Sequence, residues 1–172
     1  SQNYLKNKDL SKITFAQKLT TIMSQDLYQA PDYFLMDELL TDEHKMIRDA
    51  AREWVKRDIS PIIEEACQKA EFPKHIIPGL AEIGAFGPYI PVKYGGAGLD
   101  NISYGLIMQE LERGYRGIRS TASVQSSLFM YPIFKYGNEE QRVKYLPKLA
   151  SGEYIGCFGL TEPNHGSDPG GM

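Results

Sequence analysis

Apolar residues recur at three- and four-residue spacing through most of this chain, as expected for helices that each bury one face. The clearest example follows Thr41, where Met46, Ala50 and Trp54 share one face and basic residues occupy the other. The Thr41 hydroxyl, followed by two acidic residues, is also a typical helix start. The pattern therefore predicts a mainly α fold. Further helices are predicted from Ser60-Pro61 to Cys67, over 73–84, from the cap Asn101 to Gly114, from Arg119 to Met130, and from the cap Asn138 to about Leu146.

The last part of the chain changes from this helical pattern to an apolar run that ends in a turn-rich loop. Residues Tyr154 to Leu160 predict a short β-strand, and Gly, Pro, Asn, Ser and Asp crowd the stretch that follows. A strand that ends in such a loop offers backbone N–H groups and small hydroxyls, which suit a planar hydrogen-bonding cofactor or an anion. An ordinary β-turn connection has the same composition. The loop is neither a P-loop nor a dinucleotide-binding fingerprint, because it lacks Gly-Lys-Ser/Thr and Gly-x-Gly-x-x-Gly.

The predicted helix from Arg119 to Met130 is unusual because five of its residues carry hydroxyl groups, where a surface helix would carry Lys and Glu. Small polar side chains indicate either a closely packed pair of helices or a wall that lines a partly polar cavity, and the residues alone do not choose between them. Taken by itself, Arg119 is a surface charge at a helix start. Pro132 is expected to kink or end the helix.

Composition excludes several classes of function. With a net charge of −3, the chain has no basic footprint for nucleic acid. No apolar run approaches the roughly 20 residues that span a bilayer, so no membrane insertion is expected. Cys67 and Cys157 lack the spacing of metal ligands, which predicts no metal site and a reducing compartment.

The two ends of the sequence suggest that the natural protein starts and ends at other residues than Ser1 and Met172. The first Met-Ser pair is Met23-Ser24, so we expect residues 1–22 to be upstream translation or a leader. A transit peptide is the rival interpretation, although the segment lacks Arg and carries Asp9. The sequence stops at Met172 in a turn, after a predicted strand that has no partner, and an unpaired strand edge is an unusual place to stop. We therefore expect this chain to be a piece of a longer protein.

Three motifs together resemble the acyl-CoA dehydrogenase family. They are Tyr94-Gly95-Gly96-Ala97-Gly98-Leu99; Glu112-Arg113 with Arg119-Ser120 and Ser123-Val124-Gln125-Ser126-Ser127-Leu128; and Gly156-Cys157-Phe158-Gly159-Leu160-Thr161-Glu162-Pro163-Asn164-His165-Gly166-Ser167-Asp168-Pro169. The resemblance runs from about Tyr33 to Met172, and the second motif is similar to the glutaryl-CoA branch of the family. It implies that 33–153 is an all-α N-terminal domain and that 154–172 is the opening strand and loop of a middle β-domain. Residues 1–32 are expected to be a leader and entry segment, in which 1–22 have no counterpart in the family.

The resemblance also implies FAD as the cofactor and an acyl-CoA, in this branch glutaryl-CoA, as the substrate. Arg119 and Ser120 match residues that bind the distal glutaryl carboxylate, and Glu112 matches an acid that partners Arg119. The segment 114–118, Gly-Tyr-Arg-Gly-Ile, departs from the usual Val-Asp-Ser-Gly-Tyr. The implied cofactor-binding residues are Phe158, Gly159, Leu160, Thr161, Gly166 and Ser167, with the Thr161 hydroxyl at the flavin pyrimidine edge and Ser167 also contacting the CoA portion.

The implied reaction removes the α-proton of the thioester with a Glu base, passes a hydride to flavin N5 and decarboxylates the enoyl intermediate to crotonyl-CoA. That Glu is expected beyond Met172, so no residue here is assigned as catalytic and the chain alone is expected to be inactive. The resemblance further implies electron-transfer flavoprotein as acceptor, a homotetramer when the protein is complete, and a bacterial cytoplasm in preference to a mitochondrial matrix. The alternatives are an acyl-CoA dehydrogenase for another acyl chain, a glutaryl enzyme that does not decarboxylate, and a non-catalytic helical interaction module.

Overall fold

The computed structural model describes residues 31–172, so the predicted leader over 1–22 lies outside the described residues. The chain divides into two compact units, Ser1–Met36 and Asp37–Met172. The described part of the first unit includes a turn. The second unit carries the helical fold and every predicted site residue.

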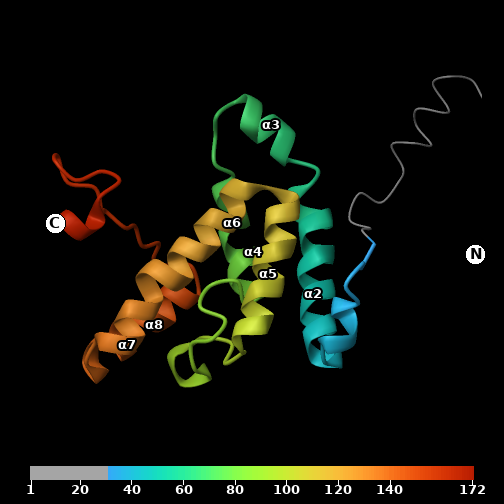
Figure 1. Cartoon of the computed structure of the whole chain (residues 1–172), viewed down its shortest axis with the longest axis horizontal. Helices are drawn as coiled ribbons and strands as arrows, with labels where there is room; N and C mark the ends of the chain where they lie inside the picture. Colours follow the sequence, from blue (N-terminus) through green and yellow to red (C-terminus); the bar gives the residue numbers. More distant parts are fainter. Residues whose placement is uncertain (1–30) are drawn as a thin grey trace, which may run out of the picture. The chain divides into compact units, whose positions relative to one another are not determined.

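Within Asp37–Met172 the structure is a set of packed helices that contains no strand, which confirms the predicted mainly α fold (Figure 1). The α-helices are α2 (Asp42–Trp54), α3 (Ile63–Gln68), α4 (Ile77–Glu82), α5 (Asn101–Gly114), α6 (Arg116–Ser123), α7 (Tyr131–Tyr136) and α8 (Glu139–Ala150). Two π-helices adjoin them, η3 (Val55–Ile59) after α2 and η6 (Val124–Met130) between α6 and α7. The short 3-10 helices are η2 (Met36–Leu39), η4 (Lys74–Ile76), η5 (Val92–Tyr94) and η7 (Pro169–Gly171).

Helices α2 and α5 lie side by side, and their N-termini are tied together (Figure 1). Thr41 caps α2 as predicted: its Oγ1 accepts from the His44 N–H at 3.2 Å, and His44 Nδ1 accepts from the Thr41 N–H at 3.3 Å. His44 Nε2 then lies 2.9 Å from Asp100 Oδ2. Asp100 caps α5 by accepting from the Ser103 N–H at 2.8 Å. The predicted cap Asn101 is therefore wrong by one residue, because the Asp100 carboxylate is the acceptor that reaches the third amide of the helix.

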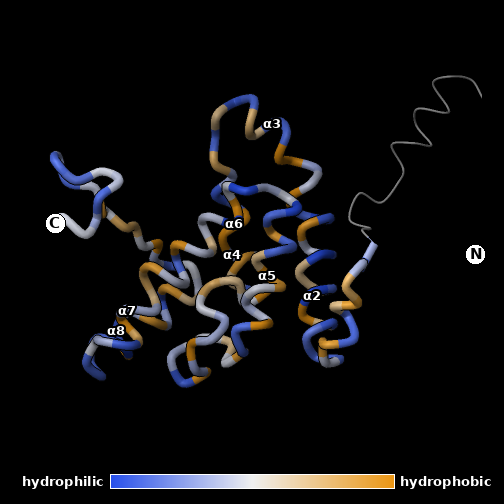
Figure 2. Tube along the Cα trace, in the orientation of Figure 1, coloured by the Kyte–Doolittle hydropathy of each residue, from blue (hydrophilic) through white to orange (hydrophobic). Residues whose placement is uncertain are grey.

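The core forms where the apolar stripes of these helices meet (Figure 2). Burial of a side chain such as Leu80 or Ile107 contributes roughly 1.5–3 kcal/mol. Apolar burial, more than helix propensity, therefore holds these short helices in place. Fully buried side chains include Val55, Leu80, Ile107, Leu111, Ile118 and Leu146.

One charged residue lies inside this core. Glu110 of α5 is fully buried, and its carboxylate accepts two hydrogen bonds from Arg52 of α2 at 2.9 and 3.0 Å. Arg113, one turn further along α5, lies 3.4 Å from Glu110 Oε1. A buried carboxylate requires such partners, because an unpaired charge in the interior costs several kcal/mol. The cluster therefore fixes α5 against α2.

The segment from Arg116 to Tyr136 is one continuous helical rod, made of α6, η6 and α7 (Figure 1). Pro132 lies within this rod and does not end it. The turns before the proline are π-helical, with the Tyr131 N–H bonded to the Ser126 carbonyl five residues earlier. The wider turn makes room for the proline ring beside the carbonyl with which it would clash in an α-helix.

Two predicted elements differ from the structure. The predicted β-strand over 154–160 is not formed, because a strand needs a neighbouring strand and the described residues supply none. An isolated antiparallel bridge between Glu162 and His165 closes the turn that follows. The predicted helix start at Ser60 is also wrong. Ser60 instead ends η3, with its N–H and Oγ both bonded to the Val55 carbonyl.

Candidate functional site

The first candidate group lies where α5 meets α6 and contains the predicted pair Glu112 and Arg119. Helix α5 ends at Gly114, Tyr115 is extended with φ −168°, and α6 begins at once with Arg116. This short connection packs the two helices together and brings Arg119 Nε to 2.6 Å from Glu112 Oε2. The predicted contact between these two residues is therefore formed.

The Arg119 guanidinium is held on one side and open on another. Glu112 accepts from its Nε, and Ser123 Oγ accepts a longer hydrogen bond from Nη1 at 3.4 Å. Its Nη2 has no hydrogen-bond partner among the described residues, and the side chain is 30% exposed. The open edge presents N–H donors in the fork geometry that matches a carboxylate or a phosphate.

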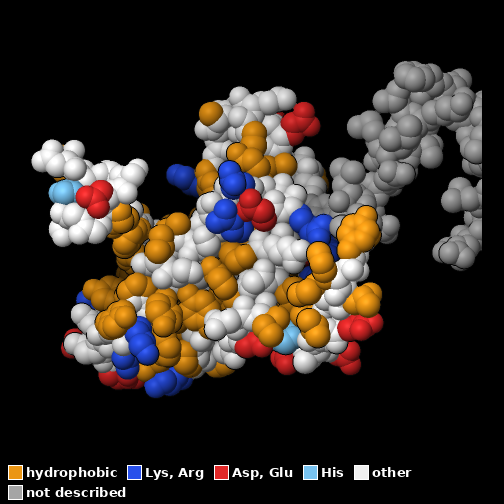
Figure 3. Space-filling view, viewed as in Figure 1, with side chains coloured by type: hydrophobic (Ala, Val, Ile, Leu, Met, Phe, Trp, Pro, Cys, Tyr) orange, Lys and Arg blue, Asp and Glu red, His pale blue; other side chains and the backbone are white. Residues whose placement is uncertain are grey.

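Two neighbours that were not predicted as site residues, Arg116 and Ser123, join this group. Arg116 Nε lies 3.4 Å from Glu112 Oε1, and its side chain is 81% exposed. Ser123 connects Arg119 to the backbone of the predicted residue Ser120, because its Oγ donates to the Ser120 carbonyl at 3.3 Å. The hydrogen bond from Arg119, together with the charge of Arg116, lowers the pKa of Glu112. Figure 3 shows basic and acidic side chains gathered on the surface where α5 meets α6.

The hydroxyl-rich helix has both of the roles that its sequence left open. Ser126 is fully buried, and its Oγ donates to the Ala85 carbonyl and accepts from the Gly87 N–H, both at 2.9 Å. That is the close-packing role. Ser127 instead shares a 2.8 Å hydrogen bond with the Tyr104 hydroxyl. It faces a depression of about 330 Å³ that is lined by Tyr89, Asn101, Tyr104, Ser127 and Tyr131.

Gln125, on η6, attaches the segment after α8 to the helical rod. Its Nε2 donates to the carbonyls of Leu149 and Tyr154 at 2.9 and 2.8 Å, and its Oε1 accepts from the Gly156 N–H at 2.9 Å. The side chain is 1% exposed. Gln125 belongs to a motif of the family resemblance, but the sequence did not predict this role, because its partners lie 24, 29 and 31 positions away.

The predicted cofactor residues lie in the segment that follows Gly156. Its backbone N–H groups from Cys157 to Thr161 have no hydrogen-bond partner among the described residues. A Cβ at Gly159 or Gly166 would meet no atom within 4 Å, so the backbone there is open to close approach. No hydrogen bond or ion pair within 31–172 joins this loop to the Arg119 group. The predicted cofactor residues are all exposed: Phe158, Gly159, Leu160, Thr161, Gly166 and Ser167.

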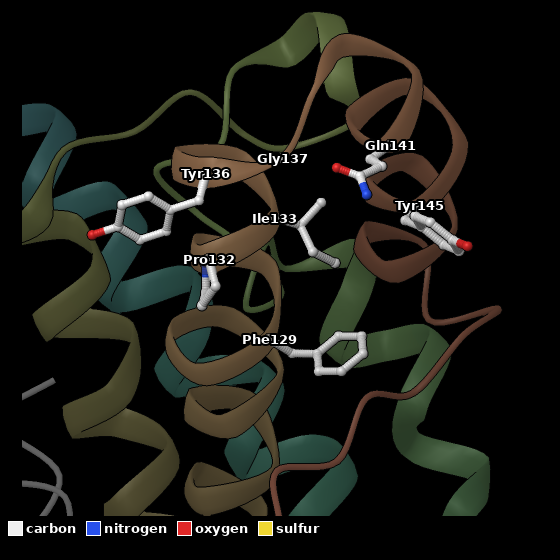
Figure 4. A pocket seen from close by; sticks show the side chains of 7 residues that line it. All are labelled: Phe129, Pro132, Ile133, Tyr136, Gly137, Gln141 and Tyr145. Atoms are coloured by element: carbon white, nitrogen blue, oxygen red, sulfur yellow. The ribbon is translucent and has the colours of Figure 1, made fainter.

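An apolar pocket of about 570 Å³ lies between the rod and α8 (Figure 4). Phe129 and Ile133 point from the rod toward the side where Tyr145 lies. Phe129 also packs on Gly156, where a Cβ would overlap the phenyl ring. The pocket therefore borders the segment that Gln125 holds. Its lining consists of Phe129, Pro132, Ile133, Tyr136, Gly137, Gln141 and Tyr145.

The described residues carry neither a membrane-spanning helix nor a metal-binding cluster. No helix of this part of the chain is long and apolar enough to cross a membrane. Between residues 31 and 172, no three His, Cys, Asp or Glu side chains gather in a way that could hold a metal ion. Cys67 and Cys157 are exposed free thiols.

Known proteins resemble this chain in sequence and in structure. The family described as "Acyl-CoA dehydrogenase, N-terminal domain" matches residues 41–153. An acyl-CoA dehydrogenase of Bacillus subtilis is 40% identical over 133 residues, which make up 77% of this chain and 35% of that protein. The crystal structure of glutaryl-CoA dehydrogenase from Mycobacterium smegmatis has a TM-score of 0.74 at 47% identity, and covers 79% of this chain and 35% of its own. A glutaryl-CoA dehydrogenase from the same organism in complex with FADH2 has a TM-score of 0.77 at 42% identity, with coverages of 81% and 36%.

The length and the position of these matches show which part of the longer relatives this chain corresponds to. The chain spans about a third of the length of the relatives, 35% or 36% in each comparison. The family match runs from the cap of α2 to just beyond α8, and it includes the pair Glu112 and Arg119. The chain therefore belongs to the acyl-CoA dehydrogenase family, of which it carries the N-terminal domain.

Proposed function

We propose that this chain is the N-terminal part of an FAD-dependent acyl-CoA dehydrogenase that oxidises glutaryl-CoA and decarboxylates it to crotonyl-CoA. The observation that carries the proposal is Arg119, which Glu112 holds at 2.6 Å while its outer N–H groups stay available. The similarity to two glutaryl-CoA dehydrogenases supports the same substrate class. In this proposal residues 33–153 form the N-terminal domain and 154–172 begin a middle domain.

A carboxylate at the end of the acyl chain is what separates glutaryl-CoA from a simple fatty acyl-CoA. An unpaired carboxylate in an apolar cavity costs several kcal/mol, whereas a guanidinium binds it through paired, charge-assisted hydrogen bonds. Arg119 supplies the guanidinium. Ser120 follows Arg119 directly, and Ser123, one turn further along the helix, accepts a hydrogen bond from Arg119 Nη1, so both serines supply small polar groups near the guanidinium. Arg119 and Ser120 are thus proposed to bind the distal carboxylate.

The segment after Gly156 fits the pyrimidine edge of a flavin, because that edge presents oxygen and nitrogen atoms that accept hydrogen bonds. Cys157 to Thr161 offer N–H groups without a partner among the described residues, and the Thr161 and Ser167 side chains are exposed. When bound, FAD supplies the acceptor for the hydride that leaves the acyl chain. Hydrogen-bond donors held at the pyrimidine edge stabilise the negative charge of the reduced flavin ring. The residues proposed to hold FAD are Phe158, Gly159, Leu160, Thr161, Gly166 and Ser167, and Ser167 is also proposed to contact the CoA portion.

The remaining parts of the proposal rest on the family relationship. The base that removes the α-proton is proposed to be a Glu outside this sequence, so the chain alone is proposed to be inactive. Electron-transfer flavoprotein is the proposed acceptor, and the complete protein is proposed to be a homotetramer. A bacterial cytoplasm is the proposed location, in preference to a mitochondrial matrix.

The test uses the complete protein, meaning this chain joined to the remainder that its longer relatives contain. We would measure kcat/KM for glutaryl-CoA and for the neutral butyryl-CoA, with a dye as electron acceptor, in the wild type and in Arg119→Gln. Loss of a charged hydrogen-bond partner is expected to lower kcat/KM for glutaryl-CoA by roughly 100-fold, and to leave butyryl-CoA almost unchanged. Arg142→Gln is the matched control, because Arg142 pairs with Glu139 at 3.6 Å on α8.

Each outcome separates the alternatives. An equal loss for both substrates, or none for either, would contradict the dicarboxylic substrate and favour a neutral acyl chain. Mass spectrometry of the product distinguishes crotonyl-CoA from the five-carbon enoyl product that a non-decarboxylating enzyme would release. A complete protein with neither bound flavin nor activity toward any acyl-CoA would favour a non-catalytic helical module.

A further inference from the structure

Gln125 bonds to the chain after α8 in the pattern of a neighbouring β-strand. In a parallel pair, one residue donates to the carbonyl of residue i on the next strand and accepts from the N–H of residue i+2. Gln125 does the same with its side chain, because Nε2 donates to the Tyr154 carbonyl and Oε1 accepts from the Gly156 N–H. The Gln125 carboxamide therefore takes the place of a neighbouring strand at Tyr154 and Gly156, although the described residues contain no strand.

A second contact from the rod holds the same residue. Phe129 lies four residues after Gln125 on η6, and its ring occupies the space where a Cβ of Gly156 would stand. The backbone of Gly156 can rest on the ring only because glycine has no side chain. The hydrogen bond that the Gly156 N–H donates to Gln125 and the packing contact with Phe129 thus fix Gly156 independently.

We propose that Gln125 is the positioning residue of the flavin loop, meaning residues 157–167, which are proposed to hold FAD, and that its carboxamide sets the register of residues 157–161. The inference rests on the proposed function, since it concerns the same cofactor site. Successive residues of an extended chain face opposite sides. Holding the Gly156 N–H against Gln125 therefore decides which of the following N–H groups face the cofactor. A slip of one residue would turn each of them to the other side.

The same rod also carries Arg119, six residues before Gln125. Buried apolar side chains hold this rod against the core, among them Ile118, Ala122 and Met130. Ser126 adds hydrogen bonds to the backbone of Ala85 and Gly87. One rigid element thus positions both the carboxylate-binding arginine and the flavin loop. This arrangement would keep a constant distance between the group that binds the distal carboxylate and the loop that holds the flavin.

The experiment compares Gln125→Met with Ser126→Ala in the complete protein. Methionine keeps the length and burial of Gln125 but cannot pair with the Tyr154 carbonyl or the Gly156 N–H. Ser126 is the matched control, because it is buried on the same π-helix and makes two hydrogen bonds to a different segment. Three quantities are measured: the dissociation constant of FAD, the Tm, and the hydrogen exchange of residues 154–161 in the apoprotein.

Gln125→Met is expected to raise the Kd of FAD by about 10-fold or more and to remove the exchange protection of the Gly156 amide. Ser126→Ala is expected to lower Tm as well, but to change the Kd of FAD less than about 2-fold. Should Gln125→Met fail to fold, Gly156→Ala replaces it. This variant pushes the Gly156 backbone off the Phe129 ring and away from the Gln125 carboxamide, and a second change, Phe129→Ala, should restore FAD binding.

The proposal is overturned if Gln125→Met keeps the FAD affinity and amide exchange of the wild type. It is also overturned if Ser126→Ala weakens FAD binding as much as Gln125→Met does, since loss of stability would then explain both. A wild-type protein that binds no FAD would instead overturn the proposed function. In that case the exchange of the Gly156 amide still shows whether Gln125 holds the segment.

Discussion

Arg119 Nε lies 2.6 Å from Glu112 Oε2, across the tight connection between α5 and α6. The approach depends on Gly114 at the end of α5, where a Cβ would lie only 2.5 Å from Val55 Cγ1. Because Glu112 takes the Nε of the guanidinium, the Nη2 group on the far side stays available for a ligand. We therefore interpret Glu112 as the residue that orients Arg119 rather than as one that meets the substrate.

Glu112→Ala is expected to lower kcat/KM for glutaryl-CoA by about 10-fold, because Arg119 loses its anchor and samples other rotamers. Glu112→Gln should lose less, since its amide oxygen can still accept from Arg119 Nε. Butyryl-CoA kinetics serve as the control, and both variants should keep them. An alanine variant that processes glutaryl-CoA as fast as the wild type would show that Arg119 needs no anchor.

Arg116→Ser introduces the serine that the family resemblance leads us to expect at this position, and should reduce kcat/KM for glutaryl-CoA by less than about 3-fold. Its side chain is 81% exposed and lies 3.4 Å from Glu112 Oε1, so it acts mainly through long-range attraction. Such attraction is screened by salt. The kcat/KM values of Arg116→Ser and of the wild type should therefore become equal as the ionic strength rises. An effect as large as that of Arg119→Gln would place Arg116 in direct contact with the substrate.

Asp100 should titrate well below an ordinary aspartate in the folded protein. Its pKa is lowered from 3.8 to about 2, first by the hydrogen bond from the Ser103 backbone and then by His44. Because the folded pKa lies below the unfolded one, the stabilising effect is complete above about pH 4 and is lost as the pH falls toward 2. Carboxyl-carbon NMR measures this pKa directly.

The two partners of Asp100 can be separated by mutation. His44→Ala should raise the pKa of Asp100 only part of the way, because the Ser103 N–H remains bonded to the carboxylate. Asp100→Asn keeps an acceptor at the helix cap, and should remove the contribution of Asp100 to the change in stability between about pH 4 and 2. A titration of Asp100 near 3.8 in the wild type would contradict both expectations.

Local signals were enough to predict the helix starts near Thr41 and Asn138. Both caps form as expected, because each cap and its partner lie three residues apart. The pairing of Glu112 with Arg119 was predicted from the family resemblance. Ser123 lies four residues from Arg119 on α6, so this added contact follows a spacing that brings helical side chains together. The contact of Arg116 with Glu112 crosses the extended residue Tyr115, so helical spacing does not predict it.

Contacts between distant segments could not be predicted in this way. Gln125 bonds to Gly156 across 31 positions, and Ser126 to Gly87 across 39. A single sequence does not show which polar side chain turns inward or which backbone groups would otherwise lack a partner. The predicted strand over 154–160 failed for the same reason. An apolar run indicates an extended chain, but only the tertiary fold shows that a glutamine side chain, and not a second strand, pairs with it.

Glu110→Gln is expected to lower the free energy of unfolding by about 3 kcal/mol, measured by urea denaturation. Loss of one partner from a buried ion pair costs about 3–5 kcal/mol, because the remaining charges are left uncompensated. The low end applies here, since the Arg52 and Arg113 side chains are 24% and 27% exposed and water can relieve part of the cost. Glu139→Gln is the control, because Glu139 also pairs with an arginine but is 62% exposed. Glu139→Gln should lower the free energy of unfolding by less than about 1 kcal/mol. An equally small loss for Glu110→Gln would show that the burial of Glu110 does not strengthen the cluster.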